Sequence, residues 1–387
     1  MRYIAGHSIY IWQRDDWPHF YWDSQALIEP MGRLAQLHGL LCGRMSLLGF
    51  NEKNRSSLKA MIEELIGSSE IEGVSLNPNS VRSSIARRLG MEQEGLLAED
   101  HYVEGLVDVM LDAVRSCHAP LSDERIFGWH APLFPLGRSG MHSITVADWR
   151  KGEKPMQVVS GAMGHEKVHY EAPPSENIPY QMTQLINWCN TATHSPFIMA
   201  AVAHLWFVTI HPFDDGNGRI SRTLADMFLS RLIGASERYY SMSAEINRNK
   251  KSYYEILEST QKGNLDITEW IIWFFHCLEN AITRAYDSIE LTLQKTRYWD
   301  KFRDIDINQR QRKVINRLWD GFDGKLTSSK WAKMCKCSQD TALRDINDLI
   351  IKGLLCNSGQ GGRSANYILP PELLSDERTG NGQKGQV

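Results

Sequence analysis

The segment that most constrains this chain is the run His211–Arg222, which holds an imidazole, carboxylates, two glycines and two guanidiniums within twelve residues. An apolar segment, Phe197–Ile210, precedes the run, and an amphipathic segment, Ile220–Leu232, follows it. Apolar segments on both sides of a glycine-containing turn predict a helix, a tight loop and a second helix. The polar groups then gather at the N-terminus of the second helix, where phosphate can bind beside a titratable group.

The residues around the turn suit an anion site. Gly216 and Gly218 allow backbone conformations that other residues avoid and let a ligand approach closely, while Asn217 between them suits a turn or an N-cap. The first N–H groups of the following helix have no intrahelical partner, and the helix dipole adds positive potential there. Together these features predict a phosphate cradle.

The charged side chains fit the same chemistry. Arg219 and Arg222 lie three residues apart, so they share a helix face, and their guanidiniums suit phosphate oxygens. Asp215 offers the hard oxygen ligands that Mg²⁺ takes with substrate phosphates, and His211 can be a neutral base. Alone, a histidine after an apolar helix is more often a core residue; the order of all these residue types favours the phosphate site.

This run resembles the signature of the Fic (Fic/DOC) family, His-Pro-Phe-x-Asp/Glu-Gly-Asn-Gly-Arg-x-x-Arg, with no departures. The resemblance implies transfer of AMP from ATP to a Ser, Thr or Tyr hydroxyl of a protein, with release of pyrophosphate. It implies that His211 deprotonates the hydroxyl and that Asp215 holds the Mg²⁺ ion that bridges the α- and β-phosphates.

The resemblance also assigns the phosphate contacts. The backbone amides of Gly216, Asn217 and Gly218, with the Asn217 side chain, are expected to stabilise charge on the α-phosphate. Arg219 and Arg222 are expected to take the β- and γ-phosphates. Positioning and charge neutralisation supply most of the rate in such displacements at phosphorus.

A second motif, Ser68–Gly73, ends a helical run that begins near Ser56. Alone, a helix end followed by glycine is ordinary capping. Beside a Fic signature, Ser68, Glu72 and Gly73 resemble the family's inhibitory helix, Ser/Thr-x-x-x-Glu-Gly/Asn. The resemblance implies that Glu72 pairs with Arg222 and blocks the productive ATP pose. Some relatives with this glutamate also remove AMP from targets, so the dominant direction stays open.

Two further elements follow from the resemblance. The segment between Trp149 and Pro174 predicts a β-hairpin. In Fic proteins such a hairpin is the flap, which holds an extended segment of the target protein. The flap candidates are Val158, Val159 and Ser160, and a purely structural hairpin is the alternative. Tyr254 and Gln261 fall where the family lines the adenine pocket, although an aromatic pair at the core edge is an equal alternative. His204 is interpreted as core packing.

Composition places the chain among ordinary globular proteins. It has 387 residues, of which 42% are hydrophobic and 23% charged. Its seven cysteines are scattered without a CxxC pair, and Cys335–Cys337 has no nearby histidine, which does not favour a metal site. No stretch approaches the roughly 20 apolar residues of a membrane helix, and Met1–Asp16 lacks the apolar core of a signal peptide. We therefore expect a cytoplasmic protein.

The fold class expected is mainly α, in four parts: an N-terminal helical module with the inhibitory motif (1–90), a Fic core (91–290), a winged helix (308–370) and a disordered tail (371–387). Ile9–Trp12 is expected to form a short strand. The tryptophan-rich opening resembles a module that precedes bacterial Fic cores.

The winged-helix prediction rests on three helical patterns, Gln309–Trp319, Ser328–Met334 and Gln339–Ile351, followed by two short apolar stretches around a glycine-rich tip. Residues 308–370 hold eleven Lys/Arg and five Asp/Glu in a chain of net charge −3, and this basic excess favours DNA binding. The expected DNA contacts are Thr341, Arg344 and Asp345 on the recognition helix and Arg363 on the wing. Protein contact or dimerisation is the alternative.

The expected partners are therefore an unidentified target protein, the chain itself as acceptor, DNA through the winged helix and a second copy, with no membrane. Three classes of function remain: an adenylyltransferase or the reverse reaction at the same site, a DNA-binding regulator whose Fic core senses nucleotide, and an interaction scaffold.

Overall fold

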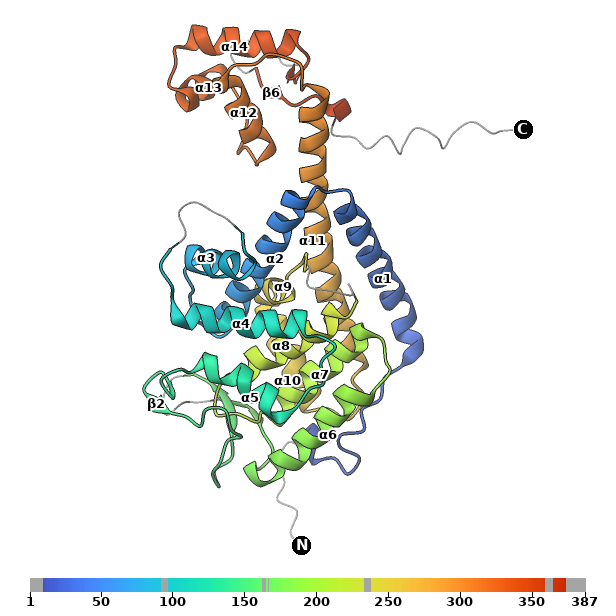
Figure 1. Ribbon diagram of the computed structural model, residues 1–387. Helices are drawn as coiled ribbons and strands as arrows, with labels where there is room; N and C mark the ends of the chain where they lie inside the picture. Colours follow the sequence, from blue (N-terminus) through green and yellow to red (C-terminus); the bar gives the residue numbers. More distant parts are fainter. Residues whose placement is uncertain are drawn as a thin grey trace, which may run out of the picture. The chain divides into compact units, whose positions relative to one another are not determined.

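The computed structural model describes residues 10–91, 97–161, 165, 167–232, 238–358 and 365–373. These residues form fourteen α-helices and three small two-stranded antiparallel sheets, so the expected mainly helical fold is confirmed (Figure 1). The chain divides into two compact units, Met1–Tyr286 and Asp287–Val387, and the boundary falls within α11 (Thr268–Lys301). The finer domain limits predicted from the sequence stay a prediction.

The first unit is built around α7 (Pro196–Ile210), whose side chains are buried on every face from Phe197 onward. It packs against α8 (Asn217–Ser230), which follows the predicted loop. Figure 1 shows the other helices of the unit around this pair. These helices are α1 (Ser24–Ser46), α2 (Phe50–Ile71), α3 (Pro78–Arg88), α4 (His101–Arg115), α5 (Asp123–His130), α6 (Ile178–Thr191), α9 (Met242–Arg248) and α10 (Lys250–Gln261).

Helix α2 is longer than the predicted run from Ser56. It ends at Ile71, and Gly73 follows with φ of +77°, a conformation that glycine adopts without strain. Contacts with α8, α9, α3 and α4 hold α2 in the body of the unit. The second motif therefore lies on the last turn of a well-packed helix.

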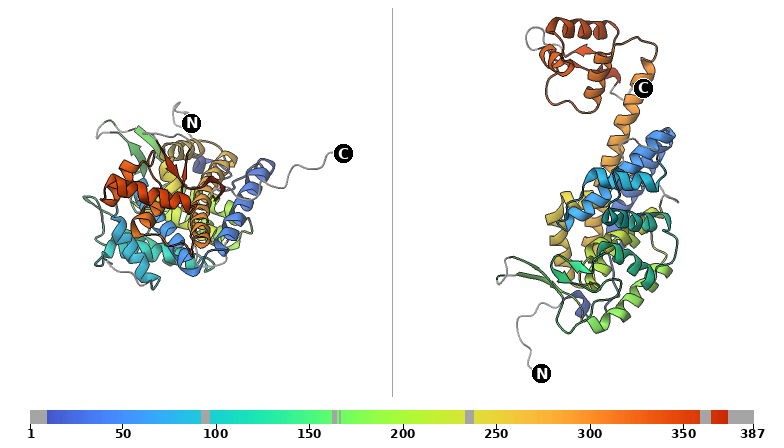
Figure 2. Two further views of the ribbon diagram at one scale, coloured as in Figure 1. Left: turned by 90° about the horizontal axis from the view of Figure 1, so that it is seen from above. Right: turned by 60° about the vertical axis from the view of Figure 1, so that its left-hand side comes forward.

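Two hairpins lie on this unit. The first pairs β1 (Arg138–Ser139) with β2 (His142–Ser143). The second, the flap hairpin, pairs β3 (Gln157–Ser160) with β4 (Lys167–Glu171) and projects from the helical body, as Figure 2 shows. The hairpin predicted between Trp149 and Pro174 is confirmed.

Short 3-10 turns connect several elements. The strand predicted at Ile9–Trp12 was wrong in its described part, because Ile11–Gln13 forms the 3-10 turn η1. The Gln13 side chain accepts the N–H of Tyr10 at 2.8 Å, which closes a turn in place of strand pairing. The other 3-10 turns are η2 (Ala131–Leu133), η3 (Ser175–Asn177) and η4 (Pro371–Leu373).

The described part of the second unit contains α12 (Gln309–Trp319), α13 (Ser328–Cys335) and α14 (Gln339–Ile351), then β5 (Cys356–Asn357) paired with β6 (Tyr367–Ile368). This order is the one predicted for a winged helix. Trp331, Ile346 and Leu349 are fully buried in its core. The glycine-rich tip with Arg363, and residues 374–387 of the predicted tail, lie outside the described residues; Pro371–Leu373 is a 3-10 turn rather than disordered chain.

Asp345 does not belong with the expected DNA contacts. It is 6% exposed, pairs with Arg310 at 2.8 Å and accepts a hydrogen bond from Asn308. A carboxylate used in this way ties α14 to the start of α12. Across the described residues, no helix combines the length and the apolar character needed to cross a membrane.

Candidate active site

His211 caps the end of α7 in a left-handed conformation, with φ of 53° and ψ of 57°. Its Nδ1 lies 3.2 Å from the carbonyl oxygen of Val208. A carbonyl can only accept, so Nδ1 carries the hydrogen and Nε2 keeps the lone pair. Burial lowers the pKa of His211 to about 4; the hydrogen bond to Val208 opposes this shift, and the positive charge of Arg150 adds to it. The imidazole is therefore neutral near pH 7.

Arg150 holds the loop at His211, a role that the sequence did not suggest. Its Nε donates to the His211 carbonyl at 2.8 Å, its backbone N–H donates to Pro212 at 2.9 Å, and Nη2 donates to the Pro173 carbonyl at 2.5 Å. Arg150 is 4% exposed. It joins the chain after the flap hairpin to the loop that carries the histidine.

His130 contacts the middle of the loop, at Phe213 and Asp215. It is fully buried and stacks on Phe213, with ring centroids 3.9 Å apart and planes 10° apart. Its Nδ1 accepts the N–H of Ala147 at 3.1 Å, so Nε2 donates to the Asp215 carbonyl at 3.0 Å. Burial lowers the pKa of His130, which keeps this ring neutral. No local pattern in the sequence distinguishes such a histidine from any other.

The Asp215 side chain is 40% exposed beside the loop. It accepts hydrogen bonds from the Ser139 hydroxyl and, at 2.5 Å, from the N–H of Gly216. Within the described ranges, no three His, Cys, Asp or Glu side chains converge to hold a metal ion by themselves. A cation here would take Asp215 as one ligand and need phosphate oxygens and water for the rest, which is the way Mg²⁺ binds with a nucleotide.

Asn217 differs from expectation. Helix α8 begins at this residue, Gly216 is the N-cap with φ of 88°, and Asn217 is 2% exposed. The Asn217 side chain accepts the Phe213 N–H at 2.9 Å and donates to the Phe213 carbonyl at 2.8 Å. The Asn217 amide thus holds the loop closed, and the backbone N–H groups of the first turn suit an anion site. The predicted contact of this side chain with the α-phosphate stays a prediction.

The two arginines of α8 have different surroundings. Arg219 donates to the Tyr102 hydroxyl at 3.1 Å and lies over the Phe134 ring. Arg222 is 3% exposed and donates from Nε to the Ser68 hydroxyl at 3.0 Å. Each keeps one buried nitrogen, Nε of Arg219 and Nη1 of Arg222, without a hydrogen-bond partner among the described residues. An anion could satisfy these donors.

Glu72 lies over the first turn of α8. Its carboxylate accepts from Nη2 of Arg222 at 2.8 Å, so the pairing predicted from the sequence is present. Gly218 makes room for it, because a Cβ on Gly218 would overlap Oε1 of Glu72. The carboxylate thus takes the place of an anion at a helix N-terminus.

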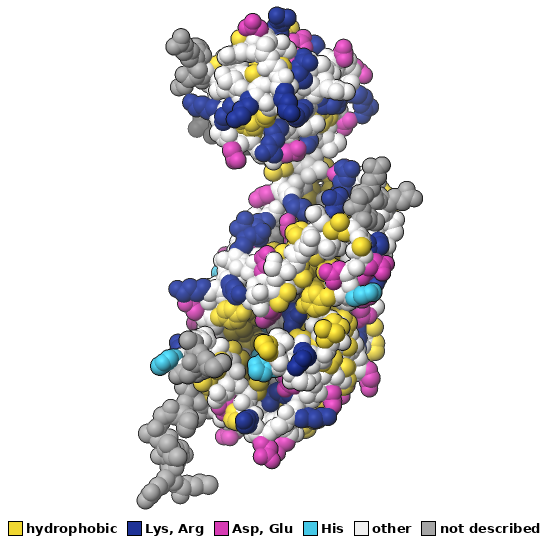
Figure 3. Space-filling view, turned by 90° about the vertical axis from the view of Figure 1, so that its left-hand side faces the viewer, with side chains coloured by type: hydrophobic (Ala, Val, Ile, Leu, Met, Phe, Trp, Pro, Cys, Tyr) yellow, Lys and Arg dark blue, Asp and Glu magenta, His cyan; other side chains and the backbone are white. Residues whose placement is uncertain are grey.

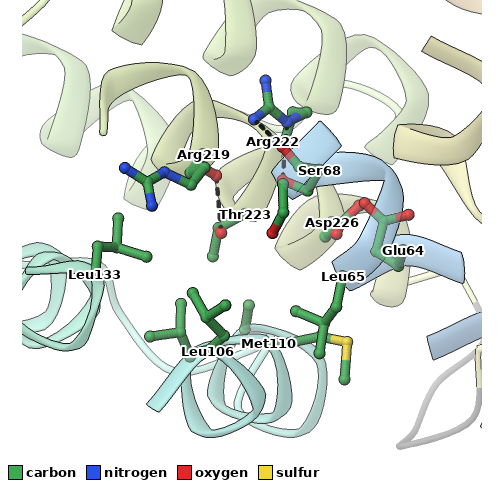
Figure 4. A pocket seen from close by; sticks show the side chains of 13 residues that line it. Glu64, Leu65, Ser68, Leu106, Met110, Leu133, Arg219, Arg222, Thr223 and Asp226 are labelled. Atoms are coloured by element: carbon green, nitrogen blue, oxygen red, sulfur yellow. Dashed lines mark hydrogen bonds between the residues drawn. The ribbon is translucent and has the colours of Figure 1, made fainter. Parts of the chain in front are cut away.

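A cavity of about 40 Å³ lies below Arg219 and Arg222, between α2, α4 and α8 (Figure 4). This volume holds a water or two and no nucleotide. Glu64 and Asp226 line its far end. Nη2 of Arg238 bridges them, at 3.1 Å from Glu64 and 2.7 Å from Asp226, and none of the three side chains is more than 8% exposed. This buried charge cluster between α2 and α8 was also missed from the sequence.

The adenine candidates separate in the structure. Tyr254 is 42% exposed, and its hydroxyl donates to the Ile71 carbonyl at 3.4 Å, beside the inhibitory motif. Gln261 is 5% exposed, and its amide donates to the Thr209 hydroxyl at 3.3 Å inside the unit, which favours a core role over the predicted adenine contact. His204 contacts the Tyr253 hydroxyl at 2.9 Å, and burial lowers the pKa of this histidine to about 3. The core interpretation of His204 agrees with these contacts.

The strand that pairs with the flap candidates contacts the end of α7, just before His211. Val158 pairs with Tyr170, whose hydroxyl donates to the Thr209 carbonyl at 2.6 Å, two residues before His211. Val159 is 48% exposed on the hairpin. Together with Arg150, this contact fixes the base of the flap hairpin beside the loop.

Comparison with known proteins identifies the region that holds this loop. Residues 120–229 match the model of the Fic/DOC family. Over these residues the chain is similar to the Fic/DOC family. Ahead of this region, residues 10–91 match a second family, described as a domain of unknown function, DUF4172.

Curated relatives of this chain are distant. The chain is 23% identical over 231 residues to "Protein adenylyltransferase Fic" of Aedes aegypti, covering 59% of this chain and 42% of that protein. It is 25% identical over 248 residues to the protein of the same name of Nematostella vectensis, covering 59% and 49%. A shorter stretch of 59 residues is 39% identical to "Protein adenylyltransferase fic-1" of Caenorhabditis elegans, covering 14% and 12%. The chain thus spans less than half the length of these relatives.

A solved structure shares the whole fold. The crystal structure of a Fic family protein from Desulfovibrio desulfuricans G20 superposes with a TM-score of 0.52 at 18% identity, covering 94% of this chain and 99% of that one. This likeness concerns the fold alone.

Proposed function

We propose that this chain is a protein adenylyltransferase: it transfers AMP from ATP to a Ser, Thr or Tyr hydroxyl of a protein, releases pyrophosphate, and is restrained by Glu72. The observation that carries the proposal is the convergence on one loop of a neutral imidazole, a half-exposed carboxylate and a helix N-terminus flanked by two arginines. The curated relatives that carry the name protein adenylyltransferase support it.

In this proposal three sets of groups have separate roles: a base, a phosphate site and a metal ligand. Nε2 of His211 takes the proton of the attacking hydroxyl, because Nδ1 is committed to Val208. The first turn of α8, with Arg219 and Arg222, binds the phosphates and stabilises the charge that develops in the transition state. Asp215 would hold Mg²⁺, which when bound neutralises charge on the phosphates and helps orient them.

In the proposed inhibition, Glu72 competes with a phosphate of ATP for one binding site. Both bind at the N-terminus of α8 and at Arg222, so the carboxylate lowers the affinity for ATP in its productive pose. The proposed resting state is therefore one of low activity, and removal of the carboxylate releases it.

The test is incorporation of α-labelled AMP into protein, with purified chain and Mg²⁺, alone and in a cell lysate. Glu72→Gly is expected to raise incorporation into lysate proteins, and Glu72→Gly combined with His211→Ala to abolish that incorporation. Glu70→Gly is the matched control, since Glu70 lies on the same helical turn and bonds to Asn247 rather than Arg222. Equal labelling of the Glu72→Gly and the double variant would reject the assignment.

The reverse reaction is a second candidate for the same site. The Glu72 side chain is 30% exposed beside the loop, so its carboxylate can also orient a water molecule toward a bound AMP ester. A protein first adenylylated by Glu72→Gly provides the substrate. Loss of AMP on addition of the unaltered chain, and retention with Glu72→Gly, would establish removal as an activity.

For the second unit we propose DNA binding. Lys333, Lys336 and Arg344 are exposed on or between α13 and α14, and Figure 3 shows Lys and Arg side chains over the face of this unit. Binding to duplex DNA that weakens steeply with salt is expected, with a shallower slope after Lys333→Ala combined with Lys336→Ala. No retardation of DNA at low salt would leave protein contact as the role of this unit.

A further inference from the structure

Three side chains of the flap hairpin and α10 form a relay that the proposed reaction does not use. The Ser160 hydroxyl lies 2.6 Å from Nε2 of His169, and Nδ1 of His169 lies 2.6 Å from Oε2 of Glu258. A carboxylate can only accept, so Nδ1–H donates to Glu258 and Nε2 accepts the Ser160 proton. This is the connectivity of an activated nucleophile, its base and the group that orients the base.

The strand register explains how the three groups meet. Val158 pairs with Tyr170 and Val159 with Val168, so His169 is the extra residue of a bulge in β4. A bulge re-aims a side chain out of the regular alternation of a strand. On the other side, Nζ of Lys262 lies 2.5 Å from Oε1 of Glu258, and the hydrogen bond from Lys262, with that from His169, lowers the pKa of Glu258. The orienting group is thus a carboxylate near pH 7.

Exposure and position make Ser160 available to a reactant. Ser160 is exposed on β3, whereas His169 and Glu258 are 27% and 28% exposed behind it. The base of the same hairpin is fixed to the catalytic loop through Tyr170 and Arg150. Ser259, an exposed serine one residue after Glu258, instead donates to the Ile256 carbonyl of its own helix. Ser160 therefore combines an accessible hydroxyl with a positioned base.

We propose that Ser160 is an acceptor of AMP, so that the protein modifies its own flap hairpin; this rests on the proposed adenylyl transfer. The Ser160 oxygen forms a bond to the α-phosphorus of ATP while the bond from that phosphorus to the bridging oxygen of the β-phosphate breaks. Pyrophosphate leaves with the electron pair. For this acceptor the proton of the hydroxyl passes to Nε2 of His169, in place of His211. Glu258 stabilises the resulting charge on His169, and the proton then passes to water.

The experiment uses the full chain with Glu72→Gly, α-labelled ATP and Mg²⁺, followed by mass-spectrometric location of the AMP. AMP on Ser160 is expected. Adding His169→Ala is expected to slow labelling at Ser160 about a hundredfold, the usual contribution of a general base. Ser160→Thr keeps a hydroxyl and is expected to retain labelling, and Ser259→Ala is the matched control expected to leave it unchanged. Melting temperatures of all variants check that they fold.

The outcomes separate the two proposals. AMP on lysate proteins or on other residues of the chain, with none on Ser160, overturns this inference and leaves adenylyl transfer standing. Labelling of Ser160 that His169→Ala and Glu258→Gln do not slow overturns the role of the relay. No AMP on any protein, in the lysate or on the chain, removes the proposed function and this inference with it.

Discussion

Helix α2 meets the catalytic helix α8 at two places that differ in burial. At its middle, Glu64 is 3% exposed and accepts hydrogen bonds from Arg238, the Ser241 hydroxyl and the Ser243 N–H, all to one oxygen. At its end, the side chain of Glu72 is 30% exposed and makes one ion pair, with Arg222. The middle contact is part of the core, and the end contact borders solvent.

This difference indicates where inhibition can be released. Departure of the whole helix would expose the buried charges around Glu64, and breaking a buried pair costs several kcal/mol. Movement of the Glu72 side chain breaks one partly exposed pair, which costs far less. We therefore expect relief of inhibition through the last turn of α2, with the rest of the helix in place.

The largest expected effect comes from breaking the middle contact. Glu64→Ala leaves the buried Arg238 with one carboxylate, Asp226, beside its hydrogen bond to the Tyr240 carbonyl. The free energy of unfolding is expected to fall by about 3–5 kcal/mol. Urea denaturation measures this, and Glu63→Ala, on the same helix with a 43% exposed side chain, is the control with little expected change. A loss below about 1 kcal/mol at Glu64 would remove the contrast between the two contacts.

The next effect comes from the packing of α2 about one turn before its end. A Cβ on Gly67 would lie 2.7–2.9 Å from the backbone of Ser243 and Ala244 at the start of α9, so Gly67→Ala forces two backbones apart. We expect a loss of about 1–3 kcal/mol in unfolding free energy. Gly43→Ala on α1 is the control: nothing lies within 4 Å of its added Cβ, and alanine favours a helix by up to about 1 kcal/mol. Equal changes in unfolding free energy for the two variants would show that α2 and α9 can move apart at Gly67 without loss of stability.

The helices of the second unit illustrate what the sequence could predict. The helical patterns predicted at Gln309–Trp319 and Gln339–Ile351 match the observed bounds of α12 and α14. The structure adds the side-chain N-caps, Asn308 and Ser338. The Fic loop, its histidine and the Glu72–Arg222 pair were likewise foreseen, because they lie in contiguous motifs.

The supports of the site could not be predicted in the same way. Arg150, His130 and Arg238 act through partners 61, 85 and 174 residues away. A buried arginine looks the same in sequence as an exposed one until the fold is known. Gln261 illustrates the same limit: the resemblance gave its position along the chain, but the rotation of α10 about its axis decides that the amide contacts Thr209 in the core.

A pH-dependent effect, spread over about three pH units, tests the charge state of the middle contact. Burial raises the pKa of Asp226 to about 7; Arg238 opposes the shift and Glu64 adds to it. Between the unfolded pKa near ~3.9 and the folded value, the folded state holds a proton that the unfolded state has lost, so stability falls as pH rises. The Asp226 contribution is expected to fall by at most about 1.4 kcal/mol per pH unit and to level off above pH 7. The free energy of unfolding is measured by urea denaturation at several pH values for the unaltered chain and for Asp226→Asn. The difference between the two profiles isolates the Asp226 contribution, and a difference that does not change with pH would contradict the raised pKa.

The smallest expected change in stability belongs to the end contact, and it comes with a large change in activity. Glu72→Gly removes a partly exposed carboxylate, while the buried Arg222 keeps its hydrogen bonds to the Ser68 hydroxyl and carbonyl. The free energy of unfolding is therefore expected to change by no more than about 1 kcal/mol. The same variant is expected to raise AMP incorporation at least about tenfold, because about 1.4 kcal/mol of competition for the phosphate site disappears. Measuring both quantities on one preparation decides the comparison. If activity rose only together with a loss of stability like that of Glu64→Ala, then the two contacts would act as one, and release would require α2 to leave as a whole.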